Sequence, residues 1–169
     1  MLTATVFPDL EQLLPHRERA ILIDGVVSHS PDGTTCRALL QEGHPYLEEG
    51  RVPGVLALEL MAQTAGVHAA LAATQSGPGA AAPEMDARAA ASVASTSRPI
   101  SGYLLAAPEF TVFSGDFALH DELLITVRPV YAAPPLAKYA AEVEVKGVQR
   151  ASGELSVFMG QRSNGGPTT

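Results

Sequence analysis

The sequence predicts an α+β domain in which an antiparallel sheet of about six strands wraps around one long central helix. Residues 55–73 form the longest apolar stretch and are apolar on nearly every side when drawn as a helix. A helix of that kind must be covered all round. Strand-like segments rich in β-branched and aromatic residues lie before it and, in greater number, after it. A curved sheet around one buried helix accounts for both observations.

The segments before the helix can be read in order. Residues 8–14 favour a short helix that Pro15 ends. Residues 20–28 and 34–41 read as two strands joined by a turn at 30–33, which predicts a hairpin. A loop then leads to Pro53 and Gly54, where the fixed φ of proline suits the first turn of a helix.

The segments after the helix divide into an insertion and four strands. Residues 75–101 are rich in Ala, Gly, Ser and Pro, and we expect a mobile insertion with at most a marginal helix at 84–94. The remaining strands are predicted at residues 103–113, 122–131, 136–146 and 148–159, separated by turns with Asp, Gly or Pro. We therefore expect one domain over residues 1–159 and a disordered tail at 160–169.

Composition excludes several classes of protein. Of the 169 residues, 18 are acidic and 11 basic, and the net charge of −7 is opposite to that of a nucleic-acid-binding domain. The single cysteine, Cys36, has no partner for an internal disulfide, and no metal-binding cysteine pattern occurs. The first ten residues lack the pattern of a signal peptide, so we expect a cytoplasmic protein. Glu59, Gln63 and His68 interrupt the apolar helix, which predicts a core helix and no membrane span.

The strongest candidate for chemistry is Glu59, a lone carboxylate in this apolar helix. We expect Leu58, Met61 and the sheet to desolvate it, and a buried charge must find a partner or shift its pKa. Gln63 follows by four residues and so lies on the same helix face. The competing interpretation is structural, with the carboxylate satisfied by Gln63, a backbone group or an arginine.

A histidine on the loop before the helix makes the chemical interpretation more specific. His44 lies between Gly43 and Pro45, where an imidazole can reach the first helical turns. A carboxyl group next to an imidazole is a pair that general acid–base catalysis uses. Taken alone, a histidine at this position is more often a solvated loop residue, and we interpret most of the other histidines as structural.

Several short motifs, in this order along the chain, resemble the 3-hydroxyacyl-acyl-carrier-protein dehydratases of the hotdog fold. The motifs are Leu13-Leu14-Pro15-His16-Arg17, Leu22-Ile23-Asp24, Gly43-His44, Pro53-Gly54-Val55-Leu56 and Glu59-Leu60-Met61-Ala62-Gln63. Two later segments are more similar to the ApeP-type dehydratases of aryl-polyene and polyketide-like gene clusters: Gly102-Tyr103-Leu104-Leu105 and residues 151–158. The resemblance covers residues 10–159 apart from the insertion.

The resemblance implies dehydration of a 3-hydroxyacyl thioester to the trans-2-enoyl thioester, without a cofactor or a metal. It assigns the base to His44 and the acid to Glu59, contributed by different subunits of a homodimer or of a heterodimer with a second hotdog subunit. Gln63 would hold Glu59, and backbone N–H groups at Gly54 and Val55 would polarise the thioester carbonyl. The loop after His44 has no HFPG sequence and is one residue longer, which leaves His16 as the alternative base.

The implied partner is an acyl carrier protein, which is itself acidic. Since this chain is acidic too, local arginines or a basic partner must provide the attraction, and the candidates are Arg17, Arg19 and Arg98. Two other functions stay open: a hotdog acyl thioesterase, in which the helix carboxylate activates water, and a non-catalytic hotdog subunit that supports an active dehydratase. The sequence does not set the length of the acyl chain or choose between a homo-oligomer and a hetero-oligomer.

Overall fold

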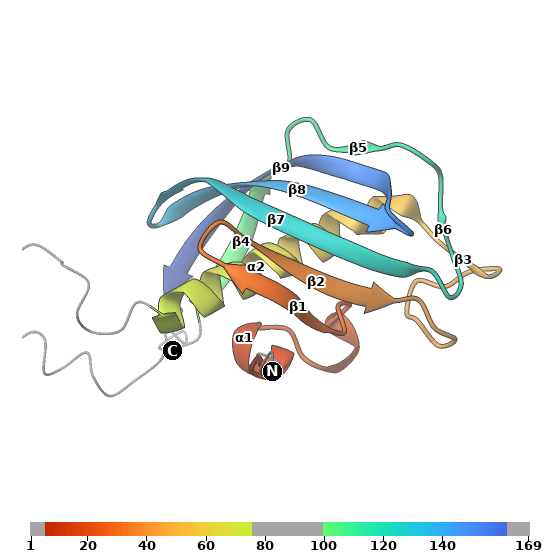
Figure 1. Cartoon of the computed structure of the whole chain (residues 1–169), viewed down its shortest axis with the longest axis horizontal. Coiled ribbons are helices and arrows are strands. Elements are labelled where there is room, and N and C mark those ends of the chain that lie inside the picture. The colour runs from red at the N-terminus through yellow and green to blue at the C-terminus, as the bar shows by residue number, and fades with distance from the viewer. Residues whose placement is uncertain (1–5, 76–99, 162–169) are drawn as a thin grey trace, which may run out of the picture.

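A curved antiparallel sheet wraps around one long helix in the computed structural model, which describes residues 6–75 and 100–161. The helix, α2, spans Ala57–Gln75 and follows a short 3-10 turn at Gly54–Leu56. Figure 1 shows α2 crossing the concave side of the sheet. The predicted fold class is therefore confirmed. The interior of the predicted insertion, with its helix at 84–94, and nearly all of the tail lie outside the described residues.

The sheet contains seven strands with one continuous path of neighbours. In spatial order these are β1 (Gly25–Ser30), β2 (Gly33–Leu39), β7 (Glu122–Ala133), β8 (Leu136–Val145), β9 (Val148–Gln161) and β4 (Ile100–Ala106), and β5 (Thr111–Val112) also pairs with β9. A separate pair joins β3 (Arg51–Val52) to β6 (Phe117–Ala118). The strand β4 thus forms one edge of the large sheet.

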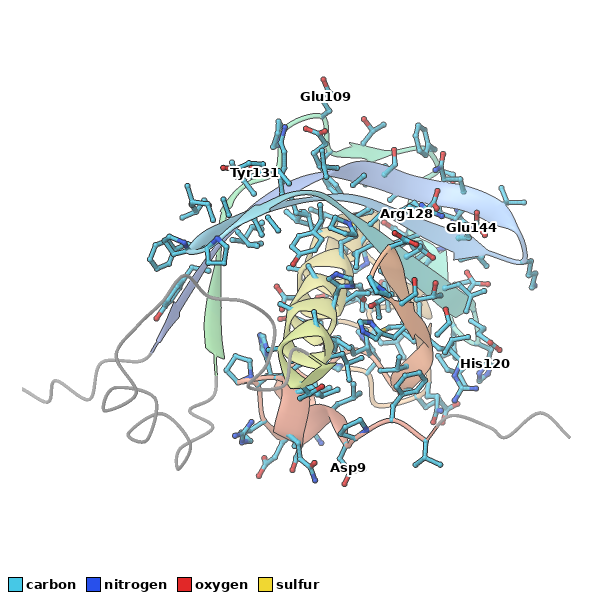
Figure 2. All side chains as sticks on the ribbon, turned by 60° about the vertical axis from the view of Figure 1, so that its left-hand side comes forward. Asp9, Glu109, His120, Arg128, Tyr131 and Glu144 are labelled. Carbon is cyan, nitrogen blue, oxygen red and sulfur yellow. The ribbon has the colours of Figure 1, made fainter. Side chains whose placement is uncertain are left out.

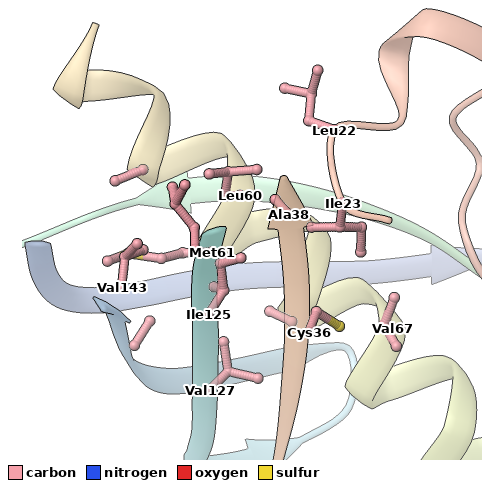
Figure 3. Packing of buried hydrophobic residues seen from close by; sticks show 14 of the residues in the cluster. Leu22, Ile23, Cys36, Ala38, Leu60, Met61, Val67, Ile125, Val127 and Val143 are labelled. Carbon is pink, nitrogen blue, oxygen red and sulfur yellow. The ribbon is translucent and has the colours of Figure 1, made fainter. Parts of the chain in front are cut away.

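The core lies between α2 and the concave face of the sheet. Along β7 the buried residues alternate as Leu123, Ile125 and Val127, because successive side chains of a strand point to opposite faces. Leu60 and Met61 of α2 are fully buried against them (Figure 3), and burial of each such side chain contributes about 1.5–3 kcal/mol. Figure 2 shows the sheet arched over α2, with α1 (Leu10–Leu13) on the side away from the sheet.

The helix is long and apolar enough to cross a membrane by length and composition. The segment Gly54–Thr74 has a mean hydropathy of 1.4. However, 56% of this window is buried inside the fold, and Leu60, Met61 and Val67 are fully buried. This is the arrangement predicted for a helix that forms the core of its own domain.

The first predicted strand was placed too early. Residues 20–28 were expected to form it, but β1 begins at Gly25, and Glu18–Ala20 form a 3-10 turn. The reason lies in Gln63 of α2, whose side chain accepts a hydrogen bond from the Leu22 backbone N–H and donates one to the Ala20 carbonyl. Backbone groups that bond to a helix side chain are not available for a strand ladder. The predicted hairpin itself is confirmed, since β1 pairs with β2.

The predicted strand at 103–113 is divided into β4 and β5. Both pieces pair with β9, and between them Pro108 cannot donate a ladder hydrogen bond while Glu109 has a positive φ of 60°. Gly153 of β9 allows the break, because a Cβ there would lie 2.9 Å from the Cα of Phe110. The strands predicted at 122–131, 136–146 and 148–159 are confirmed with boundaries shifted by a few residues.

A polar network is buried further along α2. The Thr34 hydroxyl on β2 lies 2.9 Å from Nδ1 of His68 and 2.7 Å from Nδ1 of His29. His68 is 5% exposed, and its ring meets those of His29 and Tyr139 edge-on, at 5.3 Å and 5.5 Å. Burial lowers the pKa of His68, and the neighbouring His29 lowers it further. The imidazole of His68 therefore fits into the core in its neutral form.

Candidate active site

Glu59 is held by Gln63 one turn further along α2. The Gln63 side-chain nitrogen donates a 3.0 Å hydrogen bond to Oε1 of Glu59 and a 2.7 Å hydrogen bond to the Ala20 carbonyl. Its oxygen accepts a 2.9 Å bond from the Leu22 N–H, which fixes the orientation of the amide. Gln63 is 1% exposed. The predicted pairing on one helix face is confirmed, and the pair is tied to the segment before β1.

The expected burial of Glu59 is wrong for the single chain. Its side chain is 44% exposed. Met61, which was expected to desolvate it, is fully buried against the sheet, since residues two apart on a helix point to nearly opposite sides. Glu59 therefore faces the side of α2 that the sheet leaves open.

His16 lies directly beside Glu59 in the same chain. Its Nε2 is 3.5 Å from Oε1 of Glu59, and its Nδ1 is buried without a hydrogen-bond partner among the described residues. The loop that carries it is fixed by Arg17, whose guanidinium donates to the carbonyls of Leu14 and His16 at 2.8 Å and 2.7 Å. Among the described residues, no carboxylate pairs with Arg17, so this arginine stabilises the loop instead of forming an ion pair.

His44 has different surroundings in the single chain. Its Nδ1 accepts a hydrogen bond from the Tyr46 N–H at 3.3 Å, and its Nε2 is buried without a partner in the described part of the chain. Burial lowers the pKa of His44, and the charge of Asp24 raises it in part. His44 lines neither of the two pockets that contain Glu59. Its pairing with Glu59 across a subunit boundary stays a prediction.

The start of the helix is tightly packed at Gly54. Its N–H donates to Oδ1 of Asp116 at 3.4 Å, and a Cβ here would lie 2.2 Å from the carbonyl oxygen of Gly115, so only glycine fits. Gly54 lines neither pocket that contains Glu59, whereas Val55 is 63% exposed and lines the wider one. The predicted role of these two N–H groups toward a thioester stays a prediction.

Two pockets meet at His16 and Glu59. The narrow one has a volume of about 140 Å³ and follows the open side of α2. Its walls are mainly small or apolar residues: Leu13, Leu14, Pro15, Ala62, Ala65, Gly66, Ala69, Ala70, Gly102, Leu104 and Val157. The wider pocket has a volume of about 510 Å³. Besides His16 and Glu59, it is lined by Arg19, Ala20, Leu22, Tyr46, Pro53, Val55, Leu56, Leu58 and Leu104. The pair thus stands between a narrow apolar slot and an open approach.

Sequence reasoning recognised part of this site and missed the rest. It recognised Glu59 and Gln63, and the small residues Ala62 and Gly66 on the same helix line the slot. Leu104 was not recognised as a site residue, although it lines both pockets. No local pattern marks it, because only the pairing of β4 with β9 brings it next to α2. Within the described residues, no cluster of three or more His, Cys, Asp or Glu could hold a metal ion.

Comparison with known proteins agrees with this picture. Residues 8–85 match the model of the ApeP-like family, whose description is ApeP dehydratase. The chain superposes on a chain of the dehydratase heterocomplex ApeI:P from Xenorhabdus doucetiae with a TM-score of 0.75 and 20% identity, covering 94% of each chain. No curated protein sequence matches the chain significantly.

Two thioesterase structures share the fold at lower similarity. A mutant of thioesterase PA1618 from Pseudomonas aeruginosa gives a TM-score of 0.60 at 13% identity, covering 92% of this chain and 96% of that one. A hypothetical thioesterase with coenzyme A from Streptococcus pneumoniae gives 0.54 at 13% identity, covering 82% and 88%. Identities this low establish the fold alone. The resemblance inferred from the motifs is matched by the ApeP-like family model over residues 8–85, and the chain has the fold of the hotdog dehydratases and thioesterases.

Proposed function

We propose that the chain is a subunit of a dehydratase that removes water from a 3-hydroxyacyl thioester and leaves the trans-2-enoyl thioester. The observation that carries this proposal is the position of Glu59. Gln63 holds its carboxyl group at the junction between a narrow apolar slot and a wider open pocket. The match of residues 8–85 to the ApeP-like family supports the same reaction.

The reaction needs one base and one acid on the same substrate. An imidazole takes the proton from the carbon next to the thioester carbonyl, and the pair of electrons from that C–H bond forms the new double bond. The carbon–oxygen bond at C3 breaks, and the departing hydroxyl takes a proton from Glu59 and leaves as water. Gln63 donates a hydrogen bond to Oε1 of Glu59 and not to Oε2. The two carboxyl oxygens therefore have different surroundings, which suits Glu59 to donating a proton. The open side of α2 provides the space for the substrate.

The pockets suggest how the substrate lies. The acyl chain would occupy the slot along Ala62 and Gly66, and the pantetheine arm would occupy the wider pocket. Arg19 lines that wider pocket, is exposed, and has no ion-pair partner among the described residues. It would attract the phosphate of an arm carried on an acyl carrier protein. The net charge of −7 makes such a local cation necessary.

A second hotdog subunit would complete the site along β4. This strand forms an edge of the sheet, and its residues Tyr103 and Leu105 are 60% and 58% exposed. An edge strand with exposed apolar side chains readily adds another strand. The residue between them, Leu104, lines both pockets, so a subunit paired with β4 would lie over the slot. The matched chain from Xenorhabdus doucetiae belongs to a dehydratase heterocomplex, ApeI:P, which supports a second subunit here.

The test is an assay of the purified chain, alone and with a co-purified hotdog partner, on a 3-hydroxyacyl carrier protein. Mass spectrometry should show loss of one water from the thioester. Because Gln cannot donate the proton, we expect Glu59→Gln to lower the rate at least about 100-fold while the fold is kept. Glu122→Gln, an exposed substitution of the same type, should have no effect. Release of free thiol would instead identify a thioesterase, and full activity of Glu59→Gln in complex with a partner would identify a non-catalytic subunit.

A further inference from the structure

Arg150 of β9 contacts a segment that is bonded to the start of the central helix. Its guanidinium forms no ion pair among the described residues and is directed instead at residues 113–119, which lead from β5 into β6. We propose that Arg150 is a positioning residue that acts through this segment on the backbone between His44 and Glu59. The inference rests on the proposed function, because the resemblance implies that these two residues transfer the protons.

Arg150 holds this segment at several points. Its Nη2 donates hydrogen bonds to the backbone carbonyls of Ser114 and Asp116, each at 3.1 Å, and its Nε donates to the Ser114 hydroxyl. The guanidinium carbon lies 5.5 Å from the centroid of the Phe117 ring, which is fully buried. The Arg150 carbonyl also accepts from the Phe113 N–H at 2.8 Å. Only the planar fork of an arginine can make these contacts together, because a lysine ammonium is a single point of charge.

The same segment is bonded to the backbone that precedes α2. The strand β6 pairs with β3 (Figure 1), and the Leu119 N–H donates to the Gly50 carbonyl at 3.0 Å. At the start of the helix, the Gly54 N–H donates to Oδ1 of Asp116 at 3.4 Å. The Gly115 carbonyl packs so closely on Gly54 that a Cβ at position 54 has no room. A displacement of the segment would therefore displace the backbone before α2.

This backbone connects the parts of the chain that the reaction would use. It follows the loop of His44 and precedes the helical turn that carries Glu59, so it bears on both groups even when they act in different sites of the complex. The first N–H groups of a helix have no acceptor within the helix. Since Asp116 accepts from Gly54, the N–H of Val55 would be the one available to the thioester carbonyl. A shift of about 1 Å in such a group can lower a rate about 100-fold.

The first test measures dehydration by Arg150→Ala and Arg150→Lys in the complex with the hotdog partner. We expect kcat of Arg150→Ala to fall about 10- to 100-fold with little change in KM, because the displaced groups act in the chemical step. Methylguanidinium should restore part of this rate and methylammonium should not, a difference that a general loss of folding would not produce. Arg128→Ala, which removes a guanidinium paired with Glu142 on the neighbouring strand, is the matched control. A folded Arg150→Ala with the wild-type kcat would overturn the positioning role.

The second test follows the backbone itself and does not depend on turnover. Amide deuterium exchange of Arg150→Ala should be about 10-fold faster than in the wild type for residues 113–119 and 50–56, because the bonds that hold them are lost. In Arg128→Ala both segments should exchange as in the wild type. Unchanged exchange of residues 50–56 in Arg150→Ala would overturn the inference, even if dehydration is observed. If these residues exchange faster but the wild type dehydrates no substrate with any partner, the proposed reaction fails while the anchoring by Arg150 stands.

Discussion

The side chain of Gln63 connects two parts of the chain that are far apart in sequence. It is almost fully buried and serves the Ala20 carbonyl and the Leu22 N–H in addition to Glu59. The amide thus fixes the carboxylate and the path of the chain before β1 at the same time. Removing it would leave the buried Leu22 N–H without a partner, and such a group costs about 1–3 kcal/mol.

We therefore expect Gln63→Leu to destabilise the fold and to impair catalysis. Urea denaturation should show a loss of about 1–3 kcal/mol in the free energy of unfolding, and the folded fraction should dehydrate substrate more slowly because Glu59 is no longer held. Gln12→Leu, on the exposed side of α1, is the matched control and should change stability by less than about 0.5 kcal/mol. An unchanged unfolding midpoint for Gln63→Leu would show that the amide is not a structural link.

Helix α2 presents two different sides, one to the sheet and one to the slot. On the slot side Gly66 packs closely against Leu14, since a Cβ at position 66 would lie 3.0 Å from Cδ2 of Leu14. Larger side chains at this position would fill space in a slot of about 140 Å³. The residue at position 66 should therefore limit the length of the acyl chain.

The corresponding prediction concerns Gly66→Val. We expect kcat/KM for long acyl chains to fall by about 10-fold or more, as for the loss of one or two methylene groups of space, while the shortest substrates keep their rate. Ala73→Val, at an exposed position of the same helix, controls for the β-branched residue. Equal losses for short and long substrates would indicate that the acyl chain does not occupy the slot.

Between α2 and the sheet, His68 forms a hydrogen-bonded network with Thr34 and His29. This network should make the stability of the fold sensitive to acid. Burial lowers the pKa of both histidines below the ordinary value of 6.5. The unfolded chain then binds more protons than the folded protein as the pH falls below 6.5, so stability is complete above that pH and is lost below it.

Urea denaturation between pH 7.5 and pH 5 tests this expectation. The free energy of unfolding should fall toward pH 5 by up to about 1.4 kcal/mol per pH unit for each histidine. His68→Leu should reduce this dependence, even if it lowers stability at pH 7.5, whereas His120→Asn should leave it unchanged. A His68→Leu variant with the same pH dependence as the wild type would exclude the network as its source.

The sequence predicted the parts of α2 that depend on local spacing. Glu59 and Gln63 are four residues apart, so their shared face follows from helix geometry alone, and the alternation along β7 and β8 follows from the strand period. The contact between His16 and Glu59 could not be predicted in this way. It depends on the path of residues 14–24, which Gln63 determines through long-range hydrogen bonds. The first strand was misplaced for the same reason.

At the scale of the whole molecule, β4 is the edge where the proposed second subunit would bind. We expect Tyr103→Lys to convert the complex into monomers, because a charge on an edge strand opposes pairing. Tyr131→Lys is the matched control, since Tyr131 is 58% exposed, close to the 60% of Tyr103, and lies near the end of β7 (Figure 2). Light scattering of both variants gives the mass in solution. A Tyr103→Lys protein that keeps the wild-type mass would place the interface elsewhere.

The hydrogen bonds of Gln63 have an evolutionary consequence. One amide both orients Glu59 and anchors the backbone at Ala20 and Leu22. A relative that lost the reaction would still need this amide for the path of its chain before β1. Selection on folding should therefore retain Gln63 in homologues in which position 59 has diverged.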